Sequence, residues 1–309
     1  AYLAHVHDEA VWKILLVMLF TGLTNAVDGI GRNAIIKDAV LDPRNMRMAG
    51  IVFNSIYTVG MVLGQGLAGH LVEWIGYPGS FVLNGLSFLV LIFGLSKMDF
   101  SHSKRVKAEW KGVLHIVGDN LRYVFRHPGI RTCILLAATV TLFGFAYNVI
   151  LAIINKTMFN GSRQDYSYLA AVGGAGSFVG SILSILFSQR APKTFAIGGC
   201  FIMGISQLVF SQVTNLNHGA FLMFFCGFGF MCAFLPFRGA LMHIVEPHRI
   251  GIVLGITFMF FYGGMMFSSF GAGYVAKHFG CPAVLAGCGS VLLMLGCLMP
   301  FIPSVRAIE

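Results

Sequence analysis

Charged residues are scarce in this sequence: they make up 11% of its 309 residues, whereas a soluble domain carries roughly 25%. Hydrophobic residues make up 57% of the chain, and Phe alone occurs 29 times. So few charges would not cover the surface of a globular protein in water, which excludes an ordinary soluble fold. The composition therefore predicts that lipid surrounds most of the chain.

Motifs typical of membrane enzymes and ATP-driven pumps are also missing. The sequence has no Gly-rich phosphate-binding loop, which disfavours ATP-driven transport by this chain alone. Gly85-Leu86-Ser87 and Gly204-Ile205-Ser206 resemble a nucleophile elbow, but both lack its closing glycine. The seven cysteines form no CxxC pair, and the ten histidines gather in loops or near the ends of apolar runs. We therefore expect no enzymatic activity, no cofactor and no metal site.

Long apolar runs are abundant. A helix of about 20 apolar residues crosses the ~30 Å hydrocarbon core of a bilayer. Nine runs reach this length, so we predict an all-α, multi-pass membrane protein. The predicted spans are residues 11–31, 48–72, 78–97, 130–156, 164–188, 193–213, 218–240, 250–276 and 282–302.

Basic residues are distributed unevenly between the two sides of these spans. The net charge is +9, and 15 of the 21 Lys and Arg residues fall on one side. Cytoplasmic loops of membrane proteins carry such an excess, so we expect this side and the C-terminus to face the cytoplasm from the cell (inner) membrane. Topology thereby accounts for the basic charge, and we expect no nucleic-acid partner.

A pattern of small residues and proline recurs along the chain at an offset of 204 residues (272 − 68). The matched positions are Ala68 and Ala272, Gly69 and Gly273, Gly76 and Gly280, and Pro78 and Pro282. Six spans separate the copies, so both begin on the same side of the membrane and form parallel repeats. The second half has three spans ahead of its copy. Equivalence therefore predicts twelve helices in two six-helix halves, nine of them in this chain and three before residue 1.

The longest stretch without a predicted span, residues 98–129, lies between the two halves. It is basic, and its apolar residues recur at helical spacing: Val106, Trp110, Val113, Val117, Leu121 and Val124. This pattern predicts an amphipathic helix at the cytoplasmic membrane surface. The chain thus divides into the rest of an N-terminal half (1–97), a linker (98–129) and a C-terminal half (130–309).

Two sequence patterns resemble those of the major facilitator superfamily. GMVLGQGLAG, residues 60–69, resembles the antiporter motif GxxxGPxxGG, although Gln65 replaces its proline and Ala68 its first paired glycine. RNAIIKDAVLDPRNMRMAG, followed by FVLNGLSFL, resembles the branch of proton-coupled drug, macrolide and siderophore exporters. The resemblance implies a major facilitator fold, with this chain supplying helices four to twelve.

Small residues recur every fourth position within this motif, and such a face lets another helix approach closely. The resemblance implies that the face seals one half against the other during alternating access, whereas packing against a fixed neighbour would leave the same pattern. The small-residue face consists of Gly60, Gly64 and Ala68, with Gly69 beside it. With Gln65, these residues form the candidate gating motif. A further pair, Gly176 and Gly180, predicts tight helix packing.

Asp28 and Arg32 lie four residues apart near the end of a predicted span, on one helical face, so they can pair. Ionisable groups in hydrocarbon are costly and usually face a partner or a cavity. Two interpretations stay open. The pair is either a neutralised structural contact or a proton-responsive site whose pairing changes between the inward-open and outward-open conformations.

Acidic turns occupy equivalent places in the two repeats, at Asp42-Pro43-Arg44 and Glu246-Pro247-His248-Arg249. Loop charges are usually solvated, but the resemblance implies that such turns engage neighbouring loops and steady one conformation. We group Arg238 with these turn charges. It is the counterpart of Arg32, although Phe234 stands four residues before it, where an acid precedes Arg32.

Tyr147, Asn148 and Asn155 are the main polar residues of an apolar span. The two asparagines are seven residues apart, two turns along one face, so all three residues are candidates to line a cavity. Hydrogen bonding between helices is the alternative. A bulky apolar ligand would suit the aromatic and methionine residues Phe143, Phe145, Phe258, Met259, Phe260, Tyr262, Met265 and Met266.

Together these expectations describe a secondary transporter that exports an amphipathic small molecule, such as a drug or siderophore, against protons by alternating access. Its expected partners are the small-molecule substrate, protons and the lipid bilayer, and we expect a monomer. A lipid or lysolipid flippase on the same fold is the alternative. A membrane-embedded enzyme is disfavoured by the missing motifs.

Overall fold

The computed structural model describes residues 20, 24, 46–97, 118–119, 121–187, 191–246 and 249–302. All regular elements within these residues are helices, which confirms the all-α class. The chain forms two compact units: residues 1–54 with 67–107, and residues 55–66 with 108–309.

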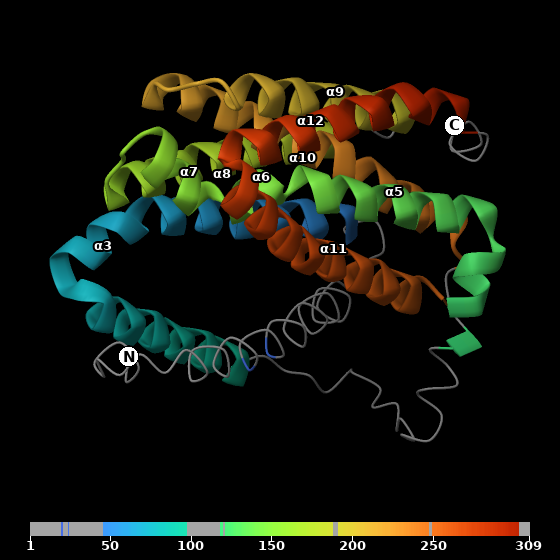
Figure 1. Cartoon of the computed structure of the whole chain (residues 1–309). Coiled ribbons are helices and arrows are strands. Elements are labelled where there is room, and N and C mark those ends of the chain that lie inside the picture. The colour runs from blue at the N-terminus through green and yellow to red at the C-terminus, as the bar shows by residue number, and fades with distance from the viewer. Residues whose placement is uncertain are drawn as a thin grey trace. The chain divides into compact units, whose positions relative to one another are not determined.

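The larger unit contains the helices that follow residue 127. In chain order they are α5 (Pro128–Gly144), α6 (Ala146–Val149), α7 (Leu151–Met158), α8 (Arg163–Phe187), α9 (Pro192–Phe210), α10 (Leu216–Ile244), α11 (Ile250–Phe279), α12 (Cys281–Leu298) and the 3-10 helix η2 (Met299–Phe301). Helix α10 packs against α5, α8 and α9, while α12 packs on α9 and α11 packs on α5 (Figure 1).

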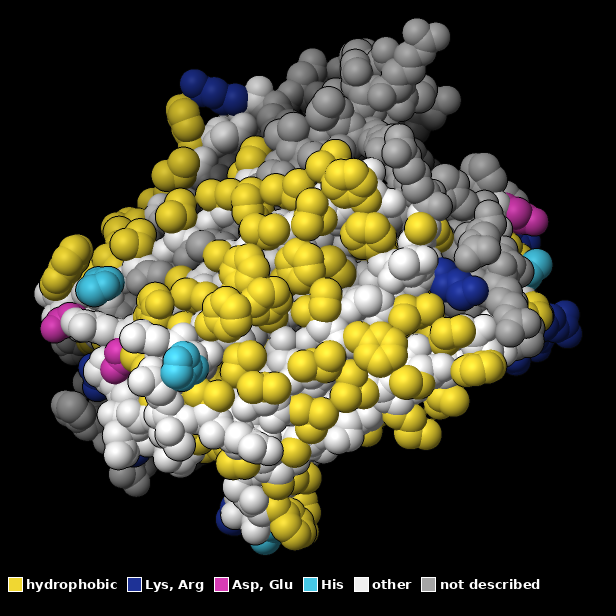
Figure 2. Space-filling model, turned by 90° about the horizontal axis from the view of Figure 1, so that it is seen from above, with side chains coloured by type: hydrophobic (Ala, Val, Ile, Leu, Met, Phe, Trp, Pro, Cys, Tyr) yellow, Lys and Arg dark blue, Asp and Glu magenta, His cyan; other side chains and the backbone are white. Residues whose placement is uncertain are grey.

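Six helices in the described part of the chain are long and apolar enough to cross a membrane: His70–Gly94, Pro128–Val149, Arg163–Phe187, Pro192–Phe210, Leu216–Leu241 and Cys281–Phe301. The predicted spans 48–72 and 250–276 are helical but are not among these six. Of the predicted span 11–31, only residues 20 and 24 are described. Apolar side chains are spread across the described part of the face shown in Figure 2, and Lys, Arg, Asp and Glu side chains lie mostly toward its edges.

The repeated Gly-x-Pro motif has nearly the same backbone conformation in both copies. Gly76 lies inside α3 (Met46–Ser96) with φ 69° and ψ 176°, and Gly280 lies between α11 and α12 with φ 84° and ψ 163°. This region of φ and ψ is essentially restricted to glycine. In each copy it interrupts the helix just before Pro78 or Pro282, so the sequence repeat is also a repeat of local structure.

Replacing Gly280 by alanine is therefore expected to lower the free energy of unfolding by about 1–3 kcal/mol, the cost of forcing a side chain into this conformation. Gly287 of α12 is a matched control, because a Cβ there would meet nothing within 4 Å. Thermal unfolding of the two purified variants in one detergent measures the difference. Equal melting temperatures for Gly280→Ala and Gly287→Ala would contradict the assigned backbone conformation.

Glycines let helix backbones meet at three crossings in the larger unit. At each crossing, a Cβ added to one glycine would touch the backbone of the partner helix. The pairs are Gly173 of α8 with Gly227 of α10, Gly199 of α9 with Gly229 of α10, and Gly204 of α9 with Gly289 of α12. The predicted tight packing at Gly176 and Gly180 is confirmed, since their Cβ positions are occupied by the backbone of Phe224 and Phe228 in α10.

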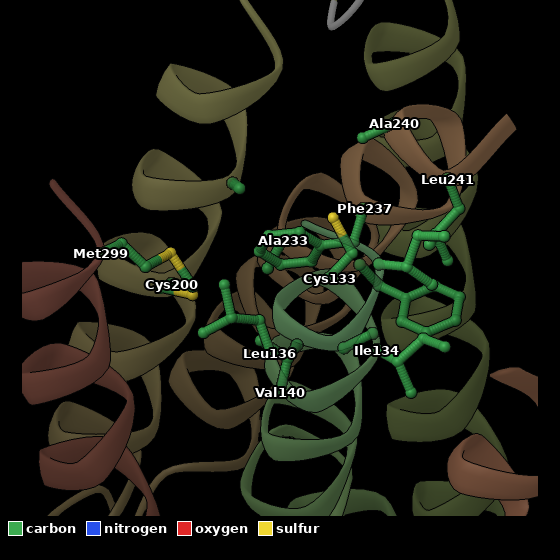
Figure 3. Close-up of a cluster of buried hydrophobic side chains, with 14 of the residues drawn as sticks. Cys133, Ile134, Leu136, Val140, Cys200, Ala233, Phe237, Ala240, Leu241 and Met299 are labelled. Carbon is green, nitrogen blue, oxygen red and sulfur yellow. The ribbon is translucent and has the colours of Figure 1, made fainter. Parts of the chain in front are cut away.

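An apolar core fills the space between α5, α9 and α10, with η2 at its edge (Figure 3). Buried side chains of α5, including Ile134 and Val140, belong to the same cluster as Phe237 and Leu241 of α10. Cys200 of α9, Met299 of η2 and Val253 of α11 belong to the same cluster. The core and the glycine crossings together hold these helices as one packed body, on which the candidate site is built.

Candidate functional site

The predicted span 130–156 is interrupted within its length: the membrane-crossing segment Pro128–Val149 consists of α5 and α6, and α7 follows as a separate helix. Phe145 and Ile150 separate α5, α6 and α7, with ψ angles of −7° and 6°. The amide of Asn148 donates to Phe145 O over 3.1 Å rather than to Gly144 O, its partner in a regular helix. The break therefore frees a buried carbonyl.

Gln207 of α9 supplies a replacement donor for this carbonyl. Its Nε2 donates to Gly144 O over 3.2 Å, and its side chain is fully buried. Non-helical backbone at membrane depth requires such a partner, because no water is available to satisfy it. The other amide atom of Gln207, Oε1, is buried with no hydrogen-bond partner among the described residues. Gln207 is not among the site residues predicted from the sequence, since nothing local in the sequence connects it to the break.

Aromatic rings form a chain from this break into α10 and α11. The ring centroids of Phe145 and Phe230 are 5.7 Å apart, and those of Phe230 and Phe234 are 5.8 Å apart in a stacked pair. Phe234 in turn contacts Phe261 of α11 at 5.0 Å. Phe145 was predicted to lie at an aromatic ligand site, whereas Phe230, Phe234 and Phe261 were not.

Arg238 of α10 lies at the other end of this aromatic chain. Its guanidinium carbon is 5.3 Å from the centroid of the Phe258 ring. Phe258 stacks with Tyr262 at 6.3 Å, and Tyr262 contacts Phe261 at 5.4 Å. Arg238 is half-buried, and its Nε has no hydrogen-bond partner among the described residues. Its surroundings are thus aromatic, and it differs from Arg249, one of the turn charges with which the sequence grouped it, because Arg249 also pairs with Glu246.

The three polar residues predicted to line a cavity have different surroundings. Tyr147 in α6 is buried and Asn148 is half-buried. Asn155 in α7 is buried, and its Nδ2 donates to Ser162 O over 2.8 Å, which ties down the loop before α8. Because α6 and α7 are separate helices, the two asparagines do not share one continuous helical face. Their role in lining a cavity stays a prediction.

The glycine motif of α3 and its second copy in α11 differ in their surroundings. Gly60, Gly64 and Ala68 are exposed, and a Cβ on either glycine would meet nothing within 4 Å. Gln65 and Gly69 lie in the same helix. In the second copy, a Cβ on Gly264 would lie 3.3 Å from Ala138 O of α5. The second copy is therefore a packing face within the larger unit.

The turn between α10 and α11 binds the chain segment just before α5. Arg249 Nε lies 3.4 Å from Glu246 Oε2, and the Arg249 guanidinium carbon is 4.6 Å from the centroid of the Tyr123 ring. Tyr123 also contacts His127 at 4.8 Å, and Val124 beside it is buried in the core. The end of the predicted linker is thus docked on this turn.

The remaining predicted site residues lie outside the described part of the chain. They are Asp28, Arg32, Asp42 and Arg44, and their roles stay predictions. Among the described residues, no group of three or more His, Cys, Asp and Glu side chains is placed to hold a metal ion.

Comparison with known proteins identifies a family. A family profile described as Major Facilitator Superfamily matches residues 2–269. The chain is also 21% identical, over 300 residues, to an uncharacterized MFS-type transporter, YfiS, of Bacillus subtilis (strain 168). That match covers 94% of this chain and 72% of the relative.

Proposed function

The chain belongs to the Major Facilitator Superfamily, and from this premise we propose that it exports an amphipathic small molecule, such as a drug or siderophore, in exchange for protons. Membership indicates secondary transport across a membrane by a multi-pass protein, and it points to a transporter rather than an enzyme. The direction of transport, the coupling ion and the substrate class are our proposal.

Alternating access in this kind of transporter requires two equivalent halves that move relative to each other. The matching conformations of Gly76 and Gly280 support this arrangement and are the observation that carries the proposal.

We propose that the chain supplies nine of twelve helices, divided at residues 1–97, 98–129 and 130–309. We propose further that the transporter is a monomer in the inner membrane, with the C-terminus in the cytoplasm as its basic residues favour.

A rocking mechanism also requires each half to keep its own packing while it moves. The backbone contacts at Gly199 and Gly204 support a rigid C-terminal half, because helices in such contact have no room to slide past each other. The small residues Gly60, Gly64 and Ala68 recur every fourth position in α3, and such a stripe supports a face that another helix can approach closely. In our proposal this face seals one half against the other.

The acidic turns act as conformational contacts in this proposal. The contact between Tyr123 and Arg249, together with the ion pair of Arg249 and Glu246, supports a docked position for the linker next to α5. By equivalence, we propose that Asp42 and Arg44 make corresponding contacts in the other half.

Inside-out vesicles from cells that express the full-length protein provide the test. An acidic vesicle interior is imposed, and two fluorescent amphipathic probes of fixed and opposite charge, a sulfonate and a quaternary ammonium, are added outside in separate experiments. We expect vesicles that contain the protein, but not vesicles without it, to accumulate at least one of the probes, and an uncoupler added beforehand to abolish this accumulation. Accumulation that survives the uncoupler would contradict proton coupling. Movement of labelled lipid between leaflets, with no solute transport, would instead favour a flippase.

A further inference from the structure

Arg238 of α10 lies beside two aromatic residues of α11, Phe258 and Tyr262. Arg238 carries a full positive charge near the C-terminal end of a helix that is apolar enough to span a bilayer. Its guanidinium lies against the Phe258 ring at 5.3 Å. Within the part of the chain that the structure describes, neither a carboxylate nor a hydrogen-bond acceptor is paired with Arg238.

The contact with the Phe258 ring does not supply hydrogen-bond acceptors for the guanidinium of Arg238. A cation–π contact contributes roughly 0.5–2 kcal/mol. It leaves the buried Nε–H without an acceptor among the described residues, and a buried unsatisfied donor costs about 1–3 kcal/mol, more when it is charged. Five N–H groups in a planar fork match the oxygens of a carboxylate, phosphate or sulfonate. A partner that offers such oxygens would stabilise Arg238, and this points to an anion.

The rings beside Arg238 indicate what the anion is attached to. Phe258 and Tyr262 stack one helical turn apart in α11. Tyr262 is 49% exposed and the adjacent Met259 is 59% exposed, so apolar surface is accessible beside the charge. Aromatic faces and methionine side chains bind flat apolar groups of varied shape. The cation and this surface together fit an organic anion with an aromatic body.

We propose that Arg238, Phe258 and Tyr262 form a subsite for amphipathic organic anions, in which the guanidinium binds the acidic group and the two rings contact the apolar body. This subsite rests on the proposed function, since it restricts the exported molecule to one charge class. A phospholipid presents the same chemistry, an oxyanion on an apolar body. The site is assigned here to the transported solute, and the two sources are separated by experiment.

Two dansyl probes of opposite charge test the subsite: dansylglycine, a carboxylate, and dansylcadaverine, an ammonium. Binding to the full-length protein in phosphatidylcholine nanodiscs is followed by dansyl fluorescence. Arg238→Gln is expected to weaken dansylglycine binding about tenfold to a hundredfold, because bonds to a charged partner are lost. Its affinity for dansylcadaverine should not fall, because an ammonium makes no bond with the guanidinium and is repelled by its charge. Arg238→Lys, which keeps the charge without the fork, should lose only part of the dansylglycine affinity.

Two further variants test the contact with the Phe258 ring and the effect of removing a cation elsewhere in the protein. Phe258→Leu is expected to weaken both probes by a similar factor, since both carry the same fluorophore. Arg131→Gln removes an exposed cation of α5 and should leave both affinities unchanged. Unchanged dansylglycine affinity in Arg238→Gln overturns the proposal, and so does equal loss of both probes, which would indicate a structural role. No dansylglycine binding by the wild-type protein would also overturn it.

Lipid composition and transport distinguish the remaining alternatives. Replacing part of the phosphatidylcholine by phosphatidylglycerol is expected to leave dansylglycine affinity unchanged. A fall that disappears in Arg238→Gln would assign the site to lipid headgroups and overturn the solute proposal. If dansylglycine binding depends on Arg238 but vesicles show no proton-driven flux of any probe, the subsite stands and proton-coupled export fails.

Discussion

Replacing Gly199 by alanine is expected to lower the free energy of unfolding by about 3 kcal/mol, near the upper end of the usual cost of overpacking. The added Cβ would lie 2.7 Å from Cys232 C and 2.8 Å from Gly229 O, and it would also contact Ala233 N. All three atoms belong to the backbone of α10, so no side-chain rotation relieves the contact. The two helices would have to separate along their crossing.

The neighbouring glycine provides the control for this prediction. A Cβ on Gly198 would meet nothing within 4 Å. Gly198→Ala should therefore be neutral or stabilise the helix by up to about 1 kcal/mol, as alanine does in helix interiors. Thermal unfolding of both variants in the same detergent, followed by tryptophan fluorescence, measures the difference. Similar melting temperatures would show that α9 and α10 do not approach each other as closely as described.

The sequence predicted part of this packing because periodicity carries that information. Gly176 and Gly180 are four residues apart, so they lie on one helical face, and their close contact with α10 was expected. Gly199 and Gly204 are five residues apart (204 − 199) and point to different neighbours, α10 and α12. A regular spacing along one helical face does not reveal glycines that contact two different helices. Their roles depend on the arrangement of helices in space.

The same distinction applies to the helix breaks. The break at Gly76 was expected, since Gly-x-Pro ends one helix and starts the next by local chemistry. The break at Phe145 has no proline, and periodicity therefore predicted a continuous span. Its freed carbonyl is satisfied by Gln207, 63 residues further along the chain. A contact of that range leaves no local signal in the sequence.

The aromatic chain between Phe145 and Arg238 was only partly predictable for a related reason. Phenylalanine is so frequent in this chain that composition does not distinguish rings in contact from rings that face lipid. Phe230 and Phe234 come together with Phe261 because α10 and α11 lie near each other in space, which the sequence does not specify. Arg238 was noticed as a charge, but its aromatic neighbours were not identified as its partners.

Asp28→Asn is expected to abolish proton-driven export while leaving substrate binding largely intact. Asp28 is the only carboxylate that lies within a predicted span of this chain rather than at its edge, since Asp165 is at the end of the span 164–188, and Arg32 lies four residues away from Asp28. A carboxylate that pairs with arginine in one conformation and binds a proton in the other links the proton to the conformational change. Asparagine keeps the size of the side chain but cannot exchange a proton. Glu73→Gln, which neutralises an exposed carboxylate of α3, is the control and should export normally.

The exchange of labelled for unlabelled substrate across vesicles separates a coupling role from a structural one. Exchange requires the protein to alternate with substrate bound, but it requires no net movement of protons. If Asp28 serves coupling, Asp28→Asn loses proton-driven export and retains exchange, and Asp28→Glu, which restores a carboxylate, recovers export. If the pair with Arg32 only holds the helix in place, Asp28→Asn loses exchange and thermal stability together. Normal export by Asp28→Asn with an unchanged pH profile would exclude this residue as the proton site, because a coupled carrier cannot work at its usual rate without its titratable group.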